Sequence, residues 1–201
     1  MKAVTKIAII LGSTRHGRNG AAVARWFYEL AVRRTDAEFE LVDPLDDELP
    51  LLDETWPPSL GMYQHAHTKR WAARVAEFDG YVFVIAEYNL GIRGALKNAI
   101  DFVYAERNNK VAGFVSYGQA GGVHAVDHLR LVAGELQVAT GRAQVSLSLI
   151  TDFENYSVFK PGPQHEQSVV ALLDQLMRWS RALETVRAAQ HETPILGHAV
   201  T

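Results

Sequence analysis

The stretch from Asp79 to Asp101 places the strongest constraint on how this chain folds. Its first part, Tyr81 to Ala86, is an apolar run without polar alternation, which is typical of a strand with both faces covered. A polar turn at 87–89 and the glycines Gly91 and Gly94 follow, and apolar residues then recur with helical spacing. The stretch therefore predicts a strand, a glycine-containing loop and a helix. In open α/β sheets, ligands bind beyond the carboxyl ends of such strands.

Strands and helices alternate along the rest of the chain. Further strands are expected at 6–11, 38–42, 111–117 and 143–149, and helices at 21–33, 69–78, 95–104, 123–138 and 164–189. This alternation predicts an α/β fold with a parallel sheet and helices on both faces. Five strands suit the doubly wound order 2-1-3-4-5, in which the loops after the first and third strands are neighbours. The polar alternation at 143–149 suits a strand at the sheet edge.

We expect one domain over residues 1–190 and a C-terminal tail at 191–201. A long connection at 43–66 precedes the helix at 69–78, and loops of this length are usually functional or mobile. Four large side chains in and after this connection either wall a ligand site or cover the core, and the sequence leaves both open. These residues are Trp56, Met62, Tyr63 and Trp71.

Composition excludes several classes of function. The 201 residues include 20 basic and 23 acidic side chains, and the net charge of −3 argues against a nucleic-acid surface and against a strongly acidic electron carrier. The chain has no cysteine, which excludes disulfides, thiolate nucleophiles and cysteine-ligated metals. No apolar run is long enough to cross a membrane and no cleavable leader is apparent. We therefore expect a cytoplasmic protein that binds neither nucleic acid nor membrane.

The loop after the first strand has the composition of an anion site. Ser13 and Thr14 offer hydroxyl donors, and Arg15 and Arg18 can grip a phosphate at the start of a helix. The alternative is a helix cap followed by solvated arginines. The nucleotide P-loop spacing is incomplete, because Arg18 and Asn19 replace its lysine and hydroxyl residue. A monophosphate therefore suits the loop better than a triphosphate.

Several segments together resemble the NADPH-dependent FMN reductase family, whose fold is flavodoxin-like. The similar segments are Leu11–Asn19, Leu49–Glu54, Thr68–Trp71, Glu87–Asn89, Gly94–Asp101, Ser116–Gly118 and Gly121–Gly122. The resemblance covers roughly residues 6–150. The chain departs from the family at Ala86, where proline is usual, and at Leu90–Arg93, where small residues and proline are common.

The resemblance implies bound FMN and assigns its contacts. The residues that would hold the FMN phosphate are Ser13, Thr14, Arg15, Arg18 and Asn19. Those that would contact the isoalloxazine ring are Glu87, Tyr88 and Asn89 on one side, and Ser116, Tyr117 and Gly118 at its other edge. No catalytic acid or base and no metal ion is expected. His124 and His128 have metal-ligand spacing, but solvated side chains are the simpler interpretation.

The implied activity is that of an FMN-dependent oxidoreductase. Hydride would pass from NADPH or NADH through FMN to a flavin, quinone, azo or similar acceptor, with ping-pong kinetics. The alternatives are a non-enzymatic flavodoxin-like electron carrier and a regulatory domain without FMN. The resemblance also implies a homodimer or homotetramer, and we expect the helices that start at Ala95 and Val123 to share one face of the sheet. The sequence leaves open the acceptor and the choice between NADPH and NADH.

Overall fold

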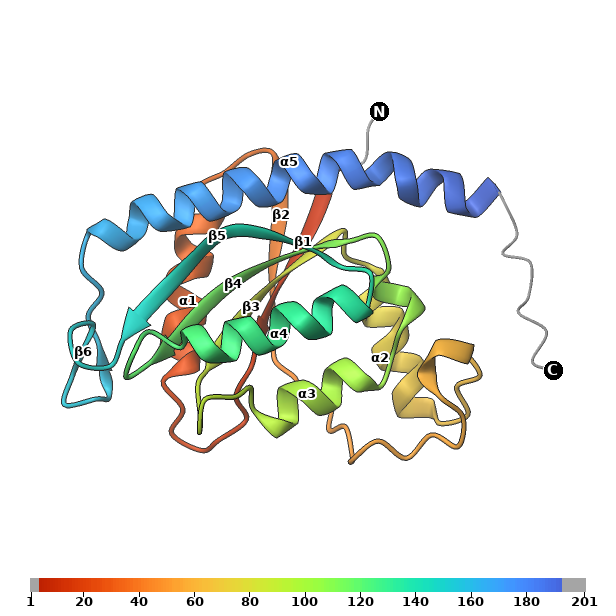
Figure 1. Cartoon of the computed structure of the whole chain (residues 1–201), viewed down its shortest axis with the longest axis horizontal. Coiled ribbons are helices and arrows are strands. Elements are labelled where there is room, and N and C mark those ends of the chain that lie inside the picture. Colours follow the sequence, from red (N-terminus) through yellow and green to blue (C-terminus); the bar gives the residue numbers. More distant parts are fainter. Residues whose placement is uncertain (1–3, 193–201) are drawn as a thin grey trace.

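A five-stranded parallel sheet forms the centre of the protein, which we describe from a computed structural model over residues 4–192. The strands are β1 (Thr5–Leu11), β2 (Ala37–Val42), β3 (Gly80–Ala86), β4 (Val111–Gly118) and β5 (Ala139–Ser148). Their order is β2-β1-β3-β4-β5, and all four pairings are parallel (Figure 1). The predicted α/β class, the flavodoxin-like architecture and the strand order are therefore confirmed.

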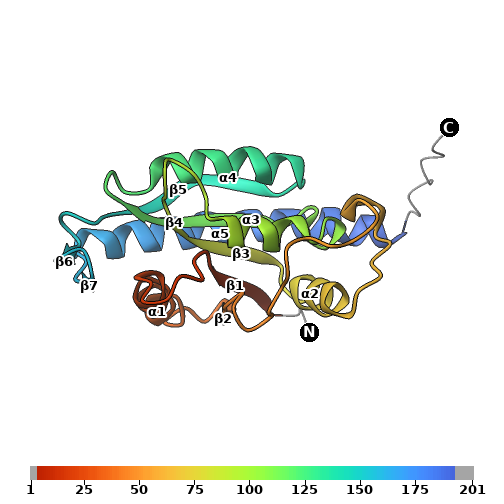
Figure 2. The ribbon, with the colours of Figure 1, turned by 90° about the horizontal axis from the view of Figure 1, so that it is seen from below.

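Helices cover both faces of the sheet. One face packs against α1 (Gly20–Ala31) and α5 (Gln164–Glu192), and the other against α2 (Ala66–Ala76), α3 (Gly94–Asp101) and α4 (Val123–Glu135). Figure 2 shows α1 beside β1 and β2, and α4 beside β4 and β5. The expectation that the helices beginning near Ala95 and Val123 share one face is confirmed. Two short 3-10 helices, η1 (Pro58–Leu60) and η2 (Ala105–Arg107), complete the helical elements of the described chain.

The burial of each strand explains the spacing of its apolar residues in the sequence. Every residue of β3 and β4 is buried, because both faces of a central parallel strand are covered by helices. In β5 only Val145 and Leu147 are fully buried, so the predicted edge strand is confirmed. This strand begins at Ala139, earlier than its polar alternation indicates, because Val111 of β4 pairs with Ala139.

A small hairpin follows β5 and was not predicted. It pairs β6 (Phe153–Glu154) with β7 (Val158–Phe159) in antiparallel fashion. The turn between them places Asn155 and Tyr156 at φ of 50° and 57°, a conformation that non-glycine residues adopt rarely. Strands of two residues are too short to show a periodic pattern. The hairpin lies at the same end of the molecule as the carboxyl end of β5 (Figures 1 and 2).

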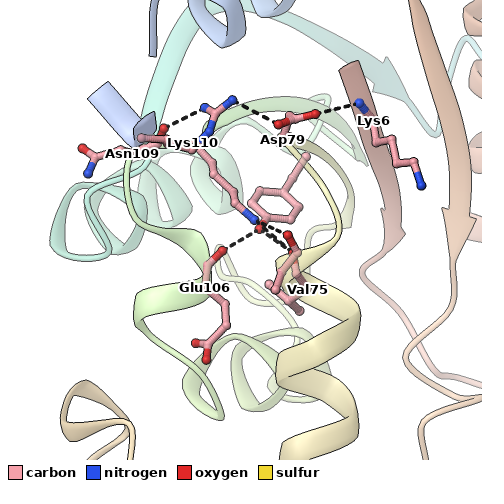
Figure 3. A network of polar contacts seen from close by, with 9 residues as sticks. Lys6, Val75, Asp79, Glu106, Asn109 and Lys110 are labelled. Carbon is pink, nitrogen blue, oxygen red and sulfur yellow. Dashed lines mark hydrogen bonds and ion pairs between the residues drawn. The ribbon is translucent and has the colours of Figure 1, made fainter. Parts of the chain in front are cut away.

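A polar network closes the opposite, amino end of the sheet (Figure 3). The Lys110 ammonium donates to the carbonyl oxygens of Val75 and Ala76 at the end of α2, at 3.2 and 3.1 Å. Arg187 of α5 binds the Asp79 carboxylate at 3.1 Å and the Asn109 carbonyl at 3.0 Å. Burial lowers the pKa of Lys110 to about 8. The network therefore joins α2, α5 and the starts of β3 and β4.

The C-terminal helix α5 extends to Glu192, past the expected start of the tail at 191. The rest of that tail, 193–201, lies outside the described residues. Within the described part of the chain, no helix combines the length and apolarity needed to cross a membrane.

Candidate cofactor site

The loops after β1, β3 and β4 lie side by side at the carboxyl edge of the sheet. The Gly12 N–H donates to the Val84 carbonyl at 2.8 Å, and the Glu87 N–H donates to the Tyr117 carbonyl at 3.0 Å. These bonds extend the β1–β3 and β3–β4 ladders into the loops. The strand order thus brings together the three loops that the sequence singled out.

The first loop is held tightly against the sheet and contains a buried polar group without a partner. A Cβ atom on Gly12 would lie 2.6 Å from the Val84 carbonyl oxygen, so the close approach requires glycine. The next residue, Ser13, is only 2% exposed, and its hydroxyl makes no hydrogen bond. Most buried polar groups in proteins are paired, and an unpaired hydroxyl carries a desolvation cost. A ligand oxygen at this loop would satisfy the Ser13 hydroxyl.

The two arginines of the loop differ in their surroundings. Arg18 donates to the Ser13 carbonyl at 2.5 Å, and both of its terminal nitrogens bind the Asp43 carboxylate. Its charge is therefore neutralised and its side chain fixes the shape of the loop. Arg15 is exposed and makes one long hydrogen bond, 3.4 Å, to the Gly17 carbonyl. Arg15 thus brings an unneutralised positive charge to the loop.

Residues of β4 and of the β6–β7 hairpin contact the start of α1. The Asn19 side-chain amide donates to the Tyr156 carbonyl at 2.8 Å. A Cβ atom on Gly20 would lie 2.9 Å from the Tyr117 hydroxyl, which places that hydroxyl at the first turn of α1. Burial raises the pKa of Tyr117 to about 12. Tyr117, expected at the ring edge, therefore stands as a neutral hydroxyl beside the first loop.

The second loop is built around the start of α4 and a tight turn. The Glu87 carboxylate accepts the backbone N–H groups of His124 and Ala125, at 2.9 and 3.1 Å, and so caps α4. Tyr88 and Gly91 exchange two backbone hydrogen bonds, at 3.1 and 3.0 Å. The turn between them places Asn89 and Leu90 at φ of 50° and 63°. Tyr88 and Asn89 are exposed at the mouth of the site.

A hydrogen bond between two of its own residues holds the third loop in place. The buried Ser116 hydroxyl donates to the Gly121 carbonyl at 2.6 Å, so this side chain supports the loop. Gly121 and Gly122 have φ of 77° and 74°, which favours glycine at both positions. A Cβ atom on Gly118 would lie 3.1 Å from the Glu87 Cβ atom. The second and third loops therefore pack directly against each other.

A cavity of about 180 Å³ adjoins the first loop on the α3 face. Its lining includes Thr14, Leu45, Glu48, Leu49, Ala95 and Asn98. The Asn98 side chain binds the long connection twice, donating to the Pro50 carbonyl at 2.6 Å and accepting the Leu52 N–H at 2.9 Å. The start of the long connection thus forms one border of the site.

Two of the four large side chains in and after the long connection cover the core. Trp71 is buried in the core, and its indole N–H donates to the Ala99 carbonyl at 2.8 Å. The Tyr63 hydroxyl donates to Glu106 at 2.9 Å, near the amino end of the sheet. Of the two interpretations, the core-covering one is therefore correct for Trp71 and Tyr63. His124 and His128 are exposed, and residues 4–192 contain no group of three or more carboxylate and histidine side chains placed to hold a metal ion.

Sequence reasoning missed three residues that border the site. Asp43, the partner of Arg18, directly follows β2, and its place beyond the strand next to β1 was a usable signal. Tyr156 belongs to a hairpin with no periodic signal. The guanidinium carbon of Arg93 lies 3.8 Å from the centre of the Tyr88 ring. Arg93 belongs to the segment that departs from the family pattern, and this departure was the available signal.

The described residues fit a bound phosphate monoester. The buried Ser13 hydroxyl lacks a partner, the Arg15 charge is unneutralised, and the helix that starts at Gly20 adds the positive end of its dipole. These features lie beside the exposed Tyr88–Gly91 turn, which borders the same edge of the sheet. This arrangement suits a ligand with a phosphate at one end and a planar group at the other.

Comparison with known proteins identifies the family. The model of the NADPH-dependent FMN reductase family matches residues 5–152. NAD(P)H-dependent FMN reductase C4B3.06c of Schizosaccharomyces pombe is 34% identical over 187 residues, which cover 92% of this chain and 94% of that protein. The quinone reductase of Escherichia coli K12 is 29% identical over 133 residues, covering 63% of this chain and 68% of that protein.

A solved structure supports the fold independently. FerB, a flavoenzyme NAD(P)H:(acceptor) oxidoreductase from Paracoccus denitrificans, superposes with a TM-score of 0.68 at 18% identity, covering 87% of this chain and 98% of that chain. The β6–β7 hairpin lies beyond the family match. The family match and the similarity of the Schizosaccharomyces pombe relative confirm the resemblance seen in the sequence. The chain belongs to the NADPH-dependent FMN reductase family.

Proposed function

We propose that the protein transfers electrons from NAD(P)H to a small acceptor by ping-pong kinetics, and that the loops after β1, β3 and β4 hold the cofactor. As a member of its family, the protein is an FMN-dependent oxidoreductase that uses NAD(P)H. When bound, FMN supplies the two-electron redox chemistry between NAD(P)H and the acceptor. The quinone reductase relative supports a quinone as one acceptor, with free flavins and azo compounds as further candidates.

The observation that carries the site assignment is the buried, unpartnered hydroxyl of Ser13 beside the unneutralised Arg15. We assign the phosphate of FMN to this loop, with Ser13, Thr14, Arg15 and Asn19 around it. Arg18 positions the loop through the Ser13 carbonyl and Asp43. Each charge-assisted hydrogen bond to a phosphate contributes about 1.5–3 kcal/mol.

The ring end of the site is assigned to the second and third loops. Tyr88 and Asn89 are exposed at the turn and are placed to contact a planar ligand. Glu87, Ser116 and Gly118 act through the backbone that they hold in place, because Glu87 caps α4, Ser116 bonds Gly121 and Gly118 packs on Glu87. These contacts pre-organise the loops before the ligand arrives, which lowers the entropic cost of binding.

Two measurements test the proposed reaction. Anaerobic FMN-loaded protein mixed with excess NADPH or NADH should lose its visible absorption, and a quinone should restore it over many cycles. Initial rates at several fixed acceptor concentrations should give parallel double-reciprocal plots, because both substrates use one place in turn. Intersecting plots would contradict the ping-pong scheme. Protein that stays yellow with both nicotinamides would behave as an electron carrier instead.

We also propose a homodimer, or a homotetramer of such dimers, formed through the face that carries α3 and α4. Leu131 on α4 is 77% exposed and Leu90 beside the site is 58% exposed, which supports an apolar contact there. Light scattering at micromolar concentration should report at least twice the 22.3 kDa mass of the chain. A monomer would refute this proposal. The cytoplasmic location stays a prediction.

A further inference from the structure

Arg93 brings a second positive charge to the site. This charge lies outside the first loop and has no carboxylate partner in the described chain. It stands at the junction of the second loop and α3, just before Gly94. Its guanidinium carbon lies 3.8 Å from the centre of the Tyr88 ring, within the range of a cation–π contact. Within residues 4–192 its guanidinium has no hydrogen-bond acceptor and no carboxylate partner. The Arg93 guanidinium is therefore stacked on Tyr88, and its positive charge is not neutralised.

Arg93 of the second loop also acts electrostatically on a residue of the third loop. Burial raises the pKa of Tyr117, and the positive charges of Arg93 and Arg15 act in the opposite direction. The Tyr117 hydroxyl itself lies against Gly20 at the start of α1. Arg93 and Arg15 belong to different loops, and both are near enough to Tyr117 to affect its pKa. A Cβ atom on Gly94 would meet nothing within 4 Å, so the space beside Arg93 is open. A guanidinium stacked by one face keeps its N–H edges free to donate to a ligand.

The charges in the site match two anionic ligands. The phosphate of FMN carries a charge of about −1.5 to −2 at neutral pH and is matched by Arg15 and the start of α1. The nicotinamide cosubstrate brings a pyrophosphate and, in NADPH, a further phosphate on the adenosine ribose. Arg18 is neutralised by Asp43 and cannot serve these groups. The unneutralised guanidinium of Arg93 is held on a different loop from Arg15, next to open space.

We propose that Arg93 binds a phosphate group of the nicotinamide cosubstrate and so determines the affinity of the protein for NAD(P)H. The Tyr88 ring covers one face of the guanidinium, and the N–H groups at the guanidinium edges remain free to donate to a phosphate. This inference rests on the proposed function, because it assumes that the nicotinamide reaches the FMN-loaded site. The segment Leu90–Arg93, which departs from the family pattern, thereby acquires a specific role.

The test measures binding without turnover. Oxidised, FMN-loaded protein is titrated with NADP⁺ and with NAD⁺ by calorimetry. Arg93→Met removes the charge but keeps an unbranched side chain that can pack on Tyr88. We expect NADP⁺ to bind about 10-fold or more weakly to this variant, the loss of one charge-assisted hydrogen bond. The salt dependence of NADP⁺ binding should also become shallower.

The two nucleotides separate the phosphate groups. A loss confined to NADP⁺ supports a contact with the ribose phosphate, and an equal loss for both supports a contact with the pyrophosphate. The matched control is Arg142→Met, which removes an exposed arginine of β5 that has no carboxylate partner in the described chain. This control should leave both affinities unchanged. Thermal unfolding of both variants checks that the fold is intact.

Three results would overturn the inference or its basis in distinguishable ways. If wild type binds nucleotide and Arg93→Met binds it equally well, the role of Arg93 is refuted and the proposed function stands. If Arg93→Met instead weakens FMN itself while the FMN-saturated variant binds NADP⁺ normally, Arg93 belongs to the cofactor contacts and the inference is wrong. If neither NADPH nor NADH reduces the FMN of the wild-type protein, the proposed function fails first.

Discussion

Replacing Ser13 by alanine should change the stability of the apoprotein and its affinity for FMN in opposite directions. The Ser13 hydroxyl is buried and has no hydrogen-bond partner within the described chain. A buried polar group without a hydrogen bond costs about 1–3 kcal/mol. Ser13→Ala removes this cost, while the contact between the Ser13 carbonyl and Arg18 involves only the backbone and remains. We expect the apoprotein to gain about 1 kcal/mol of unfolding free energy.

That gain should be visible in thermal unfolding. For a chain of this size, about 1 kcal/mol corresponds to a rise in Tm of roughly 2–4 °C. FMN should bind about 10- to 100-fold more weakly, because one hydrogen bond to its phosphate is lost. The stabilisation by saturating FMN should shrink accordingly. Differential scanning calorimetry with and without FMN, together with quenching of FMN fluorescence, measures all of these quantities.

Ser116→Ala provides a control of opposite sign. The Ser116 hydroxyl is equally buried but donates to the Gly121 carbonyl at 2.6 Å. Its removal leaves that carbonyl unpaired, and the apoprotein should lose about 1–2 kcal/mol. If Ser13→Ala also destabilises the apoprotein, its hydroxyl has a partner before FMN arrives and the reasoning fails. Unchanged affinity for FMN in Ser13→Ala would place the phosphate elsewhere.

Three further predictions concern other residues. Arg15→Ala should weaken FMN roughly 10- to 100-fold and leave the weaker binding of riboflavin, which lacks the phosphate, almost unchanged in the same fluorescence titration. Asn19→Ala removes the 2.8 Å bond to the Tyr156 carbonyl and should lower Tm through about 0.5–1.5 kcal/mol, whereas Asn155→Asp at the exposed turn should not. Burial lowers the pKa of Lys110 to about 8 from its ordinary 10.5, so the unfolded chain binds more protons in that window and stability should rise with pH across it. In urea unfolding, Lys110→Met should flatten this rise, and an unaltered slope would show that another group causes it.

Local patterns in the sequence were enough to predict most of the fold. The apolar runs of β1, β3 and β4 are continuous because helices cover both faces of the sheet, and the alternation within β5 reflects its place at the edge. The strand order cannot be read from periodicity, and its prediction rested on the order that is common in doubly wound sheets. The β6–β7 hairpin was not predicted, because strands of two residues show no periodic pattern. Packing of Phe153 against Phe159 stabilises it.

The sequence by itself indicated the three loops of the candidate site, and the family resemblance indicated the ligand. Glycines and hydroxyl residues after strands are visible without coordinates, because they mark turns and anion contacts at fixed positions along the chain. Only the tertiary structure decided what each side chain does there. In the fold, Arg18 pairs with Asp43, which is 25 residues away in the sequence, and Glu87 caps α4 by binding His124, which is 37 residues away. Arg15 and Arg93 remain without a carboxylate partner in the described chain. Neutralisation of a charge depends on which residues meet in space, and a linear pattern does not contain that information.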